Sequence, residues 1–236
     1  MLEIKEIAKT YKKANVKAID KISLEIEEGD IYGFIGPNGA GKSTTIKCIT
    51  GIHPFEEGDV LLDGLSILNN PIEFKKKIAY VPDNPDVYES LSGIEYLNFI
   101  CDIYGVGQER DALIAKYAKL FEIEGRLADS IKNYSHGMKQ KIVLISALVH
   151  KPKLLVLDEP FVGLDPKAAH NLKEVMKEIC QEGTIIFFSS HVLEVVEKLC
   201  NKIAIIKDGH IISSGSIEKV KGDASLENVF LELFNE

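Results

Sequence analysis

The chain has 236 residues, of which 45% are hydrophobic and 27% charged, and it carries a formal net charge of -8. At roughly 150 residues per domain, this length fits one large domain, or one domain that carries an insertion. The composition excludes a disordered chain and a collagen-like repeat. The acidic balance argues against nucleic acid as a partner, because phosphate binding there relies on an excess of Lys and Arg.

Further counts restrict the chemistry and the compartment. Arginine supplies only Arg110 and Arg126 among 28 basic residues, so phosphate chemistry has to rely on Lys, backbone amides and a metal unless one of these two is well placed. The four cysteines lie far apart in the sequence, which indicates free thiols in a reduced compartment. No uncharged stretch exceeds 11 residues, whereas a spanning helix needs about 20 apolar residues. We therefore expect a soluble chain that stays inside the cell, with any membrane crossing supplied by another polypeptide.

The first third of the chain predicts short strands around one helix. Strands are expected at residues 2–7, 22–26, 31–35, 60–62 and 78–81, with a glycine-rich loop at 36–41 and a helix at 42–50. From about residue 84 the apolar spacing becomes helical, over residues 96–104, 110–121 and 139–150.

Strand character then returns in alternation with helices. Strands are expected at residues 154–157, 184–189 and 203–207, and helices near 167–181 and 192–200. This alternation predicts a mainly parallel α/β sheet, into which the helical stretch 84–150 is inserted. The tail, 216–236, has the apolar spacing of an amphipathic helix that docks on the rest of the chain.

The glycine-rich loop carries the most specific motif. Gly36-Pro-Asn-Gly-Ala-Gly-Lys-Ser43 fits G-x-x-x-x-G-K-[ST] between a predicted strand and a predicted helix. Backbone amides of such a loop surround a β-phosphate, Lys42 reaches the β- and γ-phosphates, and the Ser43 hydroxyl ligates Mg²⁺. The residues expected to bind nucleotide here are Gly36, Asn38, Gly39, Ala40, Gly41, Lys42, Ser43 and Thr44. A glycine-rich turn without a ligand is the alternative, and the Lys-Ser pair argues against it.

A second acidic segment follows a buried strand. The apolar run 154–157 ends in Asp158 and Glu159, at the sheet edge where ligands bind in open α/β folds. Asp158 is expected to hold Mg²⁺, and Glu159 to orient and deprotonate the attacking water. Alone, this pattern also fits a plain strand end; together with the glycine loop it indicates a nucleotide hydrolase. A GTPase would need N-K-x-D, and the only Asn-Lys pair, Asn201-Lys202, continues Ile-Ala.

A small-molecule kinase would also fit the glycine loop, and one further segment argues against it. Tyr134-Ser-His-Gly-Met138, with Gln140 beyond it, resembles the LSGGQ-like signature of the ATP-binding cassette (ABC) family. Ser135 and Gly137 are retained, whereas the first, third and fifth positions differ. By itself the segment also fits a helix capped by Ser135.

The resemblance extends over essentially the whole chain and implies roles for further residues. Tyr11 is similar to the aromatic that stacks on adenine, with Val16 beside it. Gly163-Leu-Asp165-Pro resembles the D-loop at the dimer seam, and Ser189-Ser-His191 resembles the switch histidine. Glu159 would be the general base, and His191 would contact the γ-phosphate or the water.

One position departs from the family pattern. The family's Q-loop carries a glutamine that contacts Mg²⁺ and water, and Tyr80-Val-Pro-Asp83 places a carboxylate there. We expect Asp83 to bind Mg²⁺ through water and to increase the dependence on the metal.

The resemblance implies an α/β fold of the P-loop NTPase ABC cassette type. Its parts would be a mainly parallel core sheet, an N-terminal antiparallel β part and an inserted helical subdomain. The expected single ATPase domain, 1–236, divides into a catalytic core (1–83 and 151–215), a helical signature subdomain (84–150) and a helical tail (216–236).

The family also implies the mode of action and the partners. Two chains would sandwich two ATP molecules head to tail, with Ser135, Gly137 and Met138 of one chain closing over the nucleotide of the other. The membrane-spanning permease would be separate subunits, so the chain would lie at the inner face of the cell membrane. Val87, Leu91 and Ile94 would line the groove for a helix of the permease, or they belong to the core; both readings stay open. Export is favoured over import only by the general similarity of the sequence to bacterial exporter-type cassettes. A soluble ABC ATPase acting on the ribosome or DNA, or a regulatory one bound to a membrane complex, is the alternative.

Overall fold

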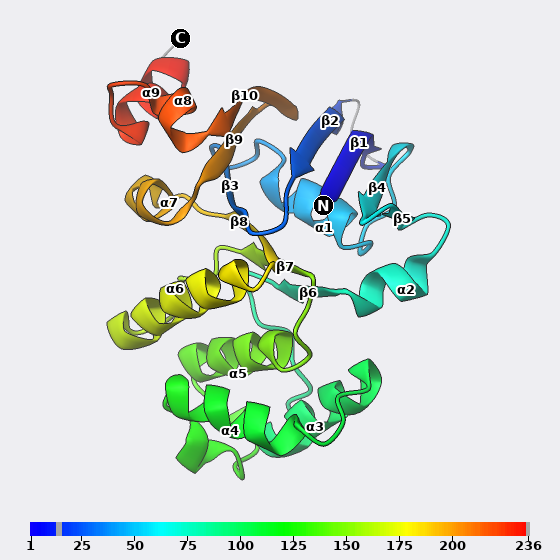
Figure 1. The fold of residues 1–236 in the computed structure, drawn as a ribbon, viewed down its shortest axis with the longest axis vertical. Helices are drawn as coiled ribbons and strands as arrows, with labels where there is room; N and C mark the ends of the chain where they lie inside the picture. The colour runs from blue at the N-terminus through cyan, green and yellow to red at the C-terminus, as the bar shows by residue number, and fades with distance from the viewer. Residues whose placement is uncertain (13–15, 235–236) are drawn as a thin grey trace.

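The computed structural model describes residues 1–12 and 16–234, and its strands form two sheets (Figure 1). The first sheet has the order β2-β1-β4-β5 and is antiparallel throughout. Its strands are β1 (Leu2–Thr10), β2 (Lys17–Ile26), β4 (Glu57–Leu62) and β5 (Leu65–Ser66).

The second sheet has the order β10-β9-β3-β8-β7-β6. All neighbours are parallel except the edge strand β10, which is antiparallel to β9. Its strands are β3 (Ile31–Ile35), β6 (Ile78–Val81), β7 (Leu154–Asp158), β8 (Ile185–Ser189), β9 (Lys202–Lys207) and β10 (His210–Ser216). Strands β3, β7 and β8 are buried along their whole length, as expected for parallel strands covered on both faces.

Most of the helices lie on the second sheet or extend away from it. They are α1 (Lys42–Ile49), α2 (Pro71–Lys76), α3 (Gly93–Tyr104), α4 (Arg110–Leu120), α5 (His136–Leu148), α6 (Pro166–Gln181), α7 (Leu193–Leu199), α8 (Ile217–Lys221) and α9 (Leu226–Phe234), with 3₁₀ turns at Glu124–Arg126 and Ile131–Asn133. In Figure 1, α3, α4 and α5 form the end of the molecule farthest from the first sheet, while α8 and α9 lie beside α7 at the opposite end. The insertion expected between β6 and β7 is therefore helical.

Two hydrophobic clusters form the core, one on each face of the second sheet. Strand β3 shows how the sequence supplies both: Tyr32 and Phe34 belong to the cluster shared with the first sheet and α1, while Ile31 and Ile35 belong to the cluster shared with α3 to α7. Successive side chains of a strand point to opposite faces, so one five-residue strand can serve both clusters.

A close contact seats α7 on β3, the strand that leads into the site. A side chain on Gly33 would lie 2.8 Å from Val196 of α7, so only glycine allows this helix to approach β3.

The two arginines pair within the helical insertion, Arg110 with Asp102 and Arg126 with Asp129. Neither lies among the residues that line the cavity described next.

Candidate active site

A cavity of about 270 Å³ lies where β3 and β7 end, the edge at which ligands bind in parallel α/β sheets. It brings together segments that are more than 100 residues apart in the chain. Its lining residues are Ala18, Asn38, Gly39, Gly41, Lys42, Ser43, Thr44, Asp83, Asp158 and Glu159.

Six of the eight predicted loop residues line this cavity, and the other two seat the loop on the core. A side chain on Gly36 would come within 2.3 Å of the Ile206 carbonyl oxygen, so the loop lies directly on β9. Ala40 is buried, and its carbonyl accepts a hydrogen bond from the Gly209 amide at 2.9 Å. Gly41, with φ of 111°, starts α1 in a conformation that favours glycine.

Lys42 is the buried cation of the site, with 8% of the residue exposed. Its ammonium donates to the carbonyls of Gly36 at 2.7 Å and Pro37 at 3.1 Å. Burial lowers the pKa of Lys42, while the carboxylates of Glu159 and Asp158 oppose that shift. A triphosphate in the cavity would favour the charged form in the same way, because opposite charges at short range stabilise one another.

Asp158 is held at the end of β7 by a residue that sequence reasoning did not single out. The Ser189 hydroxyl donates to Asp158 Oδ1 at 2.5 Å and accepts from the Glu159 amide at 3.2 Å. Asp158 and Ser189 are paired across β7 and β8, which explains why the end of β8 reaches this carboxylate.

The second oxygen of Asp158, Oδ2, is buried and has no hydrogen-bond partner among the described residues. Buried carboxylate oxygens are normally satisfied, and a divalent cation would satisfy this one. Mg²⁺ typically takes one or two carboxylates from the protein and completes its shell with phosphate oxygens and water. Ser43 and Asp83 line the same cavity, so the donor set fits Mg²⁺.

Glu159 and His191 form a contact that joins β7 to the end of β8. The Glu159 carboxylate lies 2.9 Å from His191 Nδ1 and accepts from the His191 amide at 3.3 Å. The Glu159 backbone has φ of 50°, in the left-handed region that non-glycine residues adopt infrequently. Such strain is concentrated at functional sites, and Glu159 lines the cavity.

Tyr11, Val16 and Asp83 lie at different distances from this centre. The Tyr11 hydroxyl is 3.2 Å from Thr44 Oγ1, and its ring meets His53 edge-on, so Tyr11 stands beside the phosphate loop. Val16 is 76% exposed, and its place beside the stacked base stays a prediction. Asp83 is exposed on the cavity wall, where its carboxylate accepts from the Asn84 amide.

The segments predicted to act on a second chain lie outside this lining. Ser135 caps α5, and its hydroxyl accepts from the Met138 amide at 3.3 Å. Asp165 caps α6 and accepts from the Ala168 amide at 2.9 Å. Residues 135–138 and 165 are not among the residues that line the cavity in the described part of the chain.

A second cavity, of about 440 Å³, lies between the second sheet and the helical insertion. Tyr80, Tyr96, Ile100, Tyr104 and His150 line it, and Asp83 lines both this groove and the first cavity. The residues predicted either to line the groove or to be core, Val87, Leu91 and Ile94, pack against the larger hydrophobic cluster and are absent from its lining. The three side chains are half-buried against this cluster, and both readings remain predictions.

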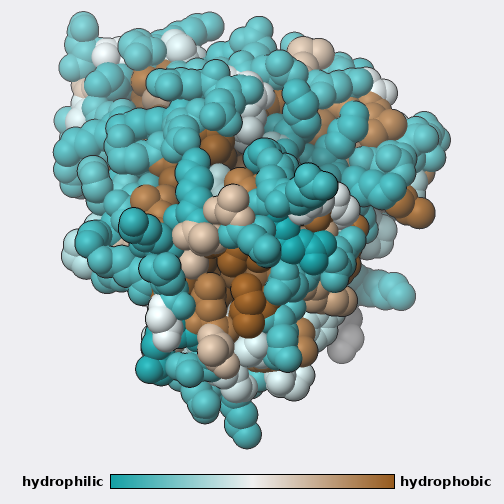
Figure 2. Space-filling model, turned by 60° about the horizontal axis from the view of Figure 1, so that its bottom comes forward, coloured by the Kyte–Doolittle hydropathy of each residue, from teal (hydrophilic) through white to brown (hydrophobic). Residues whose placement is uncertain are grey.

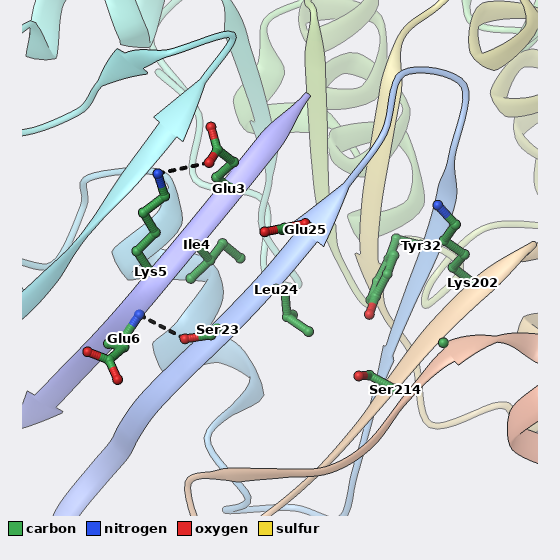
Figure 3. Close-up of a pocket in the computed structure, with 11 residues that line it drawn as sticks. Glu3, Ile4, Lys5, Glu6, Ser23, Leu24, Glu25, Tyr32, Lys202 and Ser214 are labelled. Carbon is green, nitrogen blue, oxygen red and sulfur yellow. Dashed lines mark hydrogen bonds and ion pairs between the residues drawn. The ribbon is translucent and has the colours of Figure 1, made fainter.

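A third cavity, of about 510 Å³, is larger but contains none of the predicted site residues. Figure 3 shows it between the first sheet and the end of the second, with Glu3, Glu25, Tyr32 and Lys202 on its walls. Glu3 and Lys5 on its wall form an ion pair at 2.8 Å, drawn as a dashed line in Figure 3, and so neutralise each other. It lacks both the glycine loop and the buried carboxylate, so volume alone does not identify the site.

Together, the loop around Lys42, the buried Asp158 and the Glu159–His191 pair on a parallel sheet define an ATPase of the P-loop class. A family model described as ABC transporter matches residues 19–162. The chain is 37% identical over 220 residues to the linearmycin resistance ATP-binding protein of Bacillus subtilis, covering 92% of this chain and 69% of that protein. The chain therefore belongs to the ABC transporter ATP-binding family.

Solved structures agree with this assignment. An ATP-binding subunit of an ABC transporter superimposes with a TM-score of 0.94 at 32% identity, covering 99% of each chain. A bacterial ABC transporter cassette solved as a dimer gives a TM-score of 0.83 at 26% identity, covering 92% of this chain and 99% of the other. Among residues 1–12 and 16–234, no helix combines the length and the apolar character needed to cross a membrane.

Proposed function

We propose that this chain powers export through separate membrane subunits, by ATP-driven head-to-tail dimerisation of two copies. The observation that carries the proposal is the separation of the two halves of the site. Lys42, Asp158 and Glu159 share one cavity, whereas the capped N-terminus of α5 lies outside its lining. A second copy can bring that helix end to the nucleotide, and the dimeric cassette at 26% identity supports this arrangement.

In this proposal each residue of the site has a role. Lys42 and the loop amides bind the β- and γ-phosphates, and Tyr11 contacts the base. Glu159 takes the proton of the attacking water, oriented by the His191 imidazole at 2.9 Å. Mg²⁺, bound by Ser43 and Asp158 and through water by Asp83, would neutralise charge on the phosphate oxygens.

The groove between the second sheet and the helical insertion is the proposed docking place for the membrane subunits. It is lined by tyrosines and Ile100, and Asp83 connects it to the nucleotide cavity. Figure 2 turns the helical end toward the viewer and shows apolar surface gathered in a band between polar regions. Tyr88, Phe99 and Ile103 are exposed apolar residues of this part of the chain. Docking there would place the chain at the inner face of the membrane. The relative named for linearmycin resistance supports export.

The oligomeric state of the Glu159→Gln variant, measured by light scattering with and without Mg-ATP, tests the sandwich. We expect a monomer without nucleotide and a dimer with it, because binding persists while hydrolysis, which would open the dimer, is blocked. The matched control adds Lys42→Ala, which removes the phosphate cation and should leave a monomer under both conditions. A Glu159→Gln chain that binds ATP and remains monomeric would contradict a homodimer.

The role of Asp83 has its own test, the Mg²⁺ dependence of the ATPase rate in Asp83→Gln. If the Asp83 carboxylate holds the metal through water, the ATPase rate of the wild type should depend more strongly on Mg²⁺. The glutamine variant should therefore show a shifted Mg²⁺ titration. An unchanged titration would contradict a metal role for Asp83.

A further inference from the structure

The signature segment and the D-loop of one and the same chain are interlocked. A side chain on Gly137 would lie 2.6 Å from the Gly163 carbonyl oxygen. A side chain on Gly163 would lie 2.6 Å from Cδ2 of the His136 ring. Neither glycine has room for a methyl group, so the two backbones meet directly and the imidazole ring packs against Gly163.

An ion pair ties the same two segments together one helical turn further on. The Lys141 ammonium lies 2.7 Å from Asp165 Oδ2, while Asp165 Oδ1 accepts from the first turn of α6. Only 13% of the Lys141 side chain is exposed, so its stem is packed and the pair is held in place. The hydrogen bond from Lys141 lowers the pKa of Asp165.

The ring of His136 occupies a place where the family pattern has glycine. With glycine, the contact with Gly163 would be lost and the tie would rest on the ion pair alone. The chain therefore has two independent side-chain ties between the start of α5 and the D-loop.

We propose that His136 and Lys141 are positioning residues that fix the D-loop to the start of α5, so that a chain presents both segments to its partner's nucleotide as one body. This inference rests on the proposed head-to-tail dimer. Its consequence is coupling: the two sites of the dimer would close together, because neither segment can move against the other.

The test compares His136→Ala and Lys141→Met with the conservative variants His136→Phe, which keeps a ring, and Lys141→Arg, which keeps the charge. Hydrogen exchange of the amides of residues 163–165 is measured on the nucleotide-free protein. We expect exchange there to become roughly 2- to 30-fold faster in the first pair of variants, the range that loss of such coupling contacts produces. The conservative variants should exchange at the wild-type rate.

Kinetics provide the functional readout. In the first pair the Hill coefficient for ATP and kcat should fall, while the ATP affinity of the monomer stays unchanged, since neither side chain lines the cavity of its own chain. The amides of β7 serve as an internal reference: faster exchange there as well would mean global destabilisation and would overturn a specific positioning role. Unchanged exchange at residues 163–165 would overturn the interlock.

Failure of the dimer model is distinguishable from failure of this inference. If the wild type hydrolyses ATP without cooperativity, and Glu159→Gln stays monomeric, the sandwich fails while the exchange result still decides the interlock. If exchange responds as expected but the Hill coefficient and kcat do not change, the interlock exists without coupling the sites, and the proposed positioning role is overturned.

Discussion

At the scale of single residues, Ser189 shows what the sequence did not reveal about the site. The sequence analysis singled out His191 from Ser189-Ser-His, because the segment resembles the switch histidine of the family. The structure shows that the fully buried Ser189 joins Asp158 to the Glu159 amide. Its position opposite Asp158 in β8 was the available signal, and reading it required the strand register.

We expect Ser189→Ala to lower the ATP turnover rate by about tenfold, because it leaves a buried carboxylate oxygen short of a donor, at a cost of about 1–3 kcal/mol. Steady-state ATPase assays check this prediction. The matched control is Ser214→Ala in β10, whose exposed hydroxyl lies in the third cavity, and it should turn over ATP like the wild type. Equal rates for both variants would rule out the proposed support of Asp158.

His150 gives a pH prediction. Burial lowers its pKa to about 4, and its ring stacks on Tyr104 with centroids 3.7 Å apart. The unfolded chain therefore binds a proton below pH ~6.5 that the folded chain does not, so folding stability falls as pH drops from about 6.5 toward 4. His150→Phe, which keeps a stacking ring, should lose about 2 kcal/mol less unfolding free energy than the wild type between pH 7 and 5. Urea unfolding at both pH values measures the difference, and parallel losses would contradict it.

At the scale of elements, a side-chain cap explains where helix α3 begins. Helix α3 begins earlier than the predicted residue 96 because Ser92 and Glu95 form a capping box, with Glu95 accepting from the Ser92 amide at 2.8 Å. Apolar periodicity does not report such caps. The sequence also missed α2 and β10, since a six-residue helix gives too short a pattern and the seven residues of β10 include only two apolar ones.

Ser92→Ala should reduce the free energy of unfolding by about 1 kcal/mol, because it removes the hydroxyl that accepts from the Glu95 amide and donates to the Glu95 carboxylate, while the bond from the residue 92 amide remains. Ser90→Ala is the control, since Ser90 is exposed two residues outside the helix cap, and it should change stability by less than about 0.5 kcal/mol. Urea titrations of the two variants check the prediction. Indistinguishable midpoints would mean that the box contributes nothing to the stability of the folded chain.

At the scale of the whole molecule, the C-terminal helix closes the core beside the site. Leu226 of α9 is fully buried in the larger hydrophobic cluster, and its amide donates to Glu197 of α7. Phe230 lines a small cavity together with Pro37 and His191. The tail that was predicted to dock therefore contacts α7, the helix that follows His191.

Leu226→Ala should cost about 2–5 kcal/mol of unfolding free energy, as for other buried leucines that leave a cavity. Leu231→Ala on the same helix is the control, because Leu231 is 49% exposed and its truncation should change stability by less than about 0.5 kcal/mol. Thermal and urea unfolding measure both. Equal, small effects would show that α9 does not contribute to the cooperative core.

The sequence by itself determined most of the strands and helices in chain order, the phosphate loop with Lys42, the pair Asp158–Glu159, and the resemblance to the family. These follow from local spacing and motif chemistry, which act over a few residues. The tertiary structure alone decided that Ser189 supports Asp158, that Val87, Leu91 and Ile94 lie half-buried against the larger hydrophobic cluster, and that the His136 ring packs against Gly163. Such contacts join residues brought together by sheet order and helix packing, and a pattern read along one segment carries no record of what another segment places beside it.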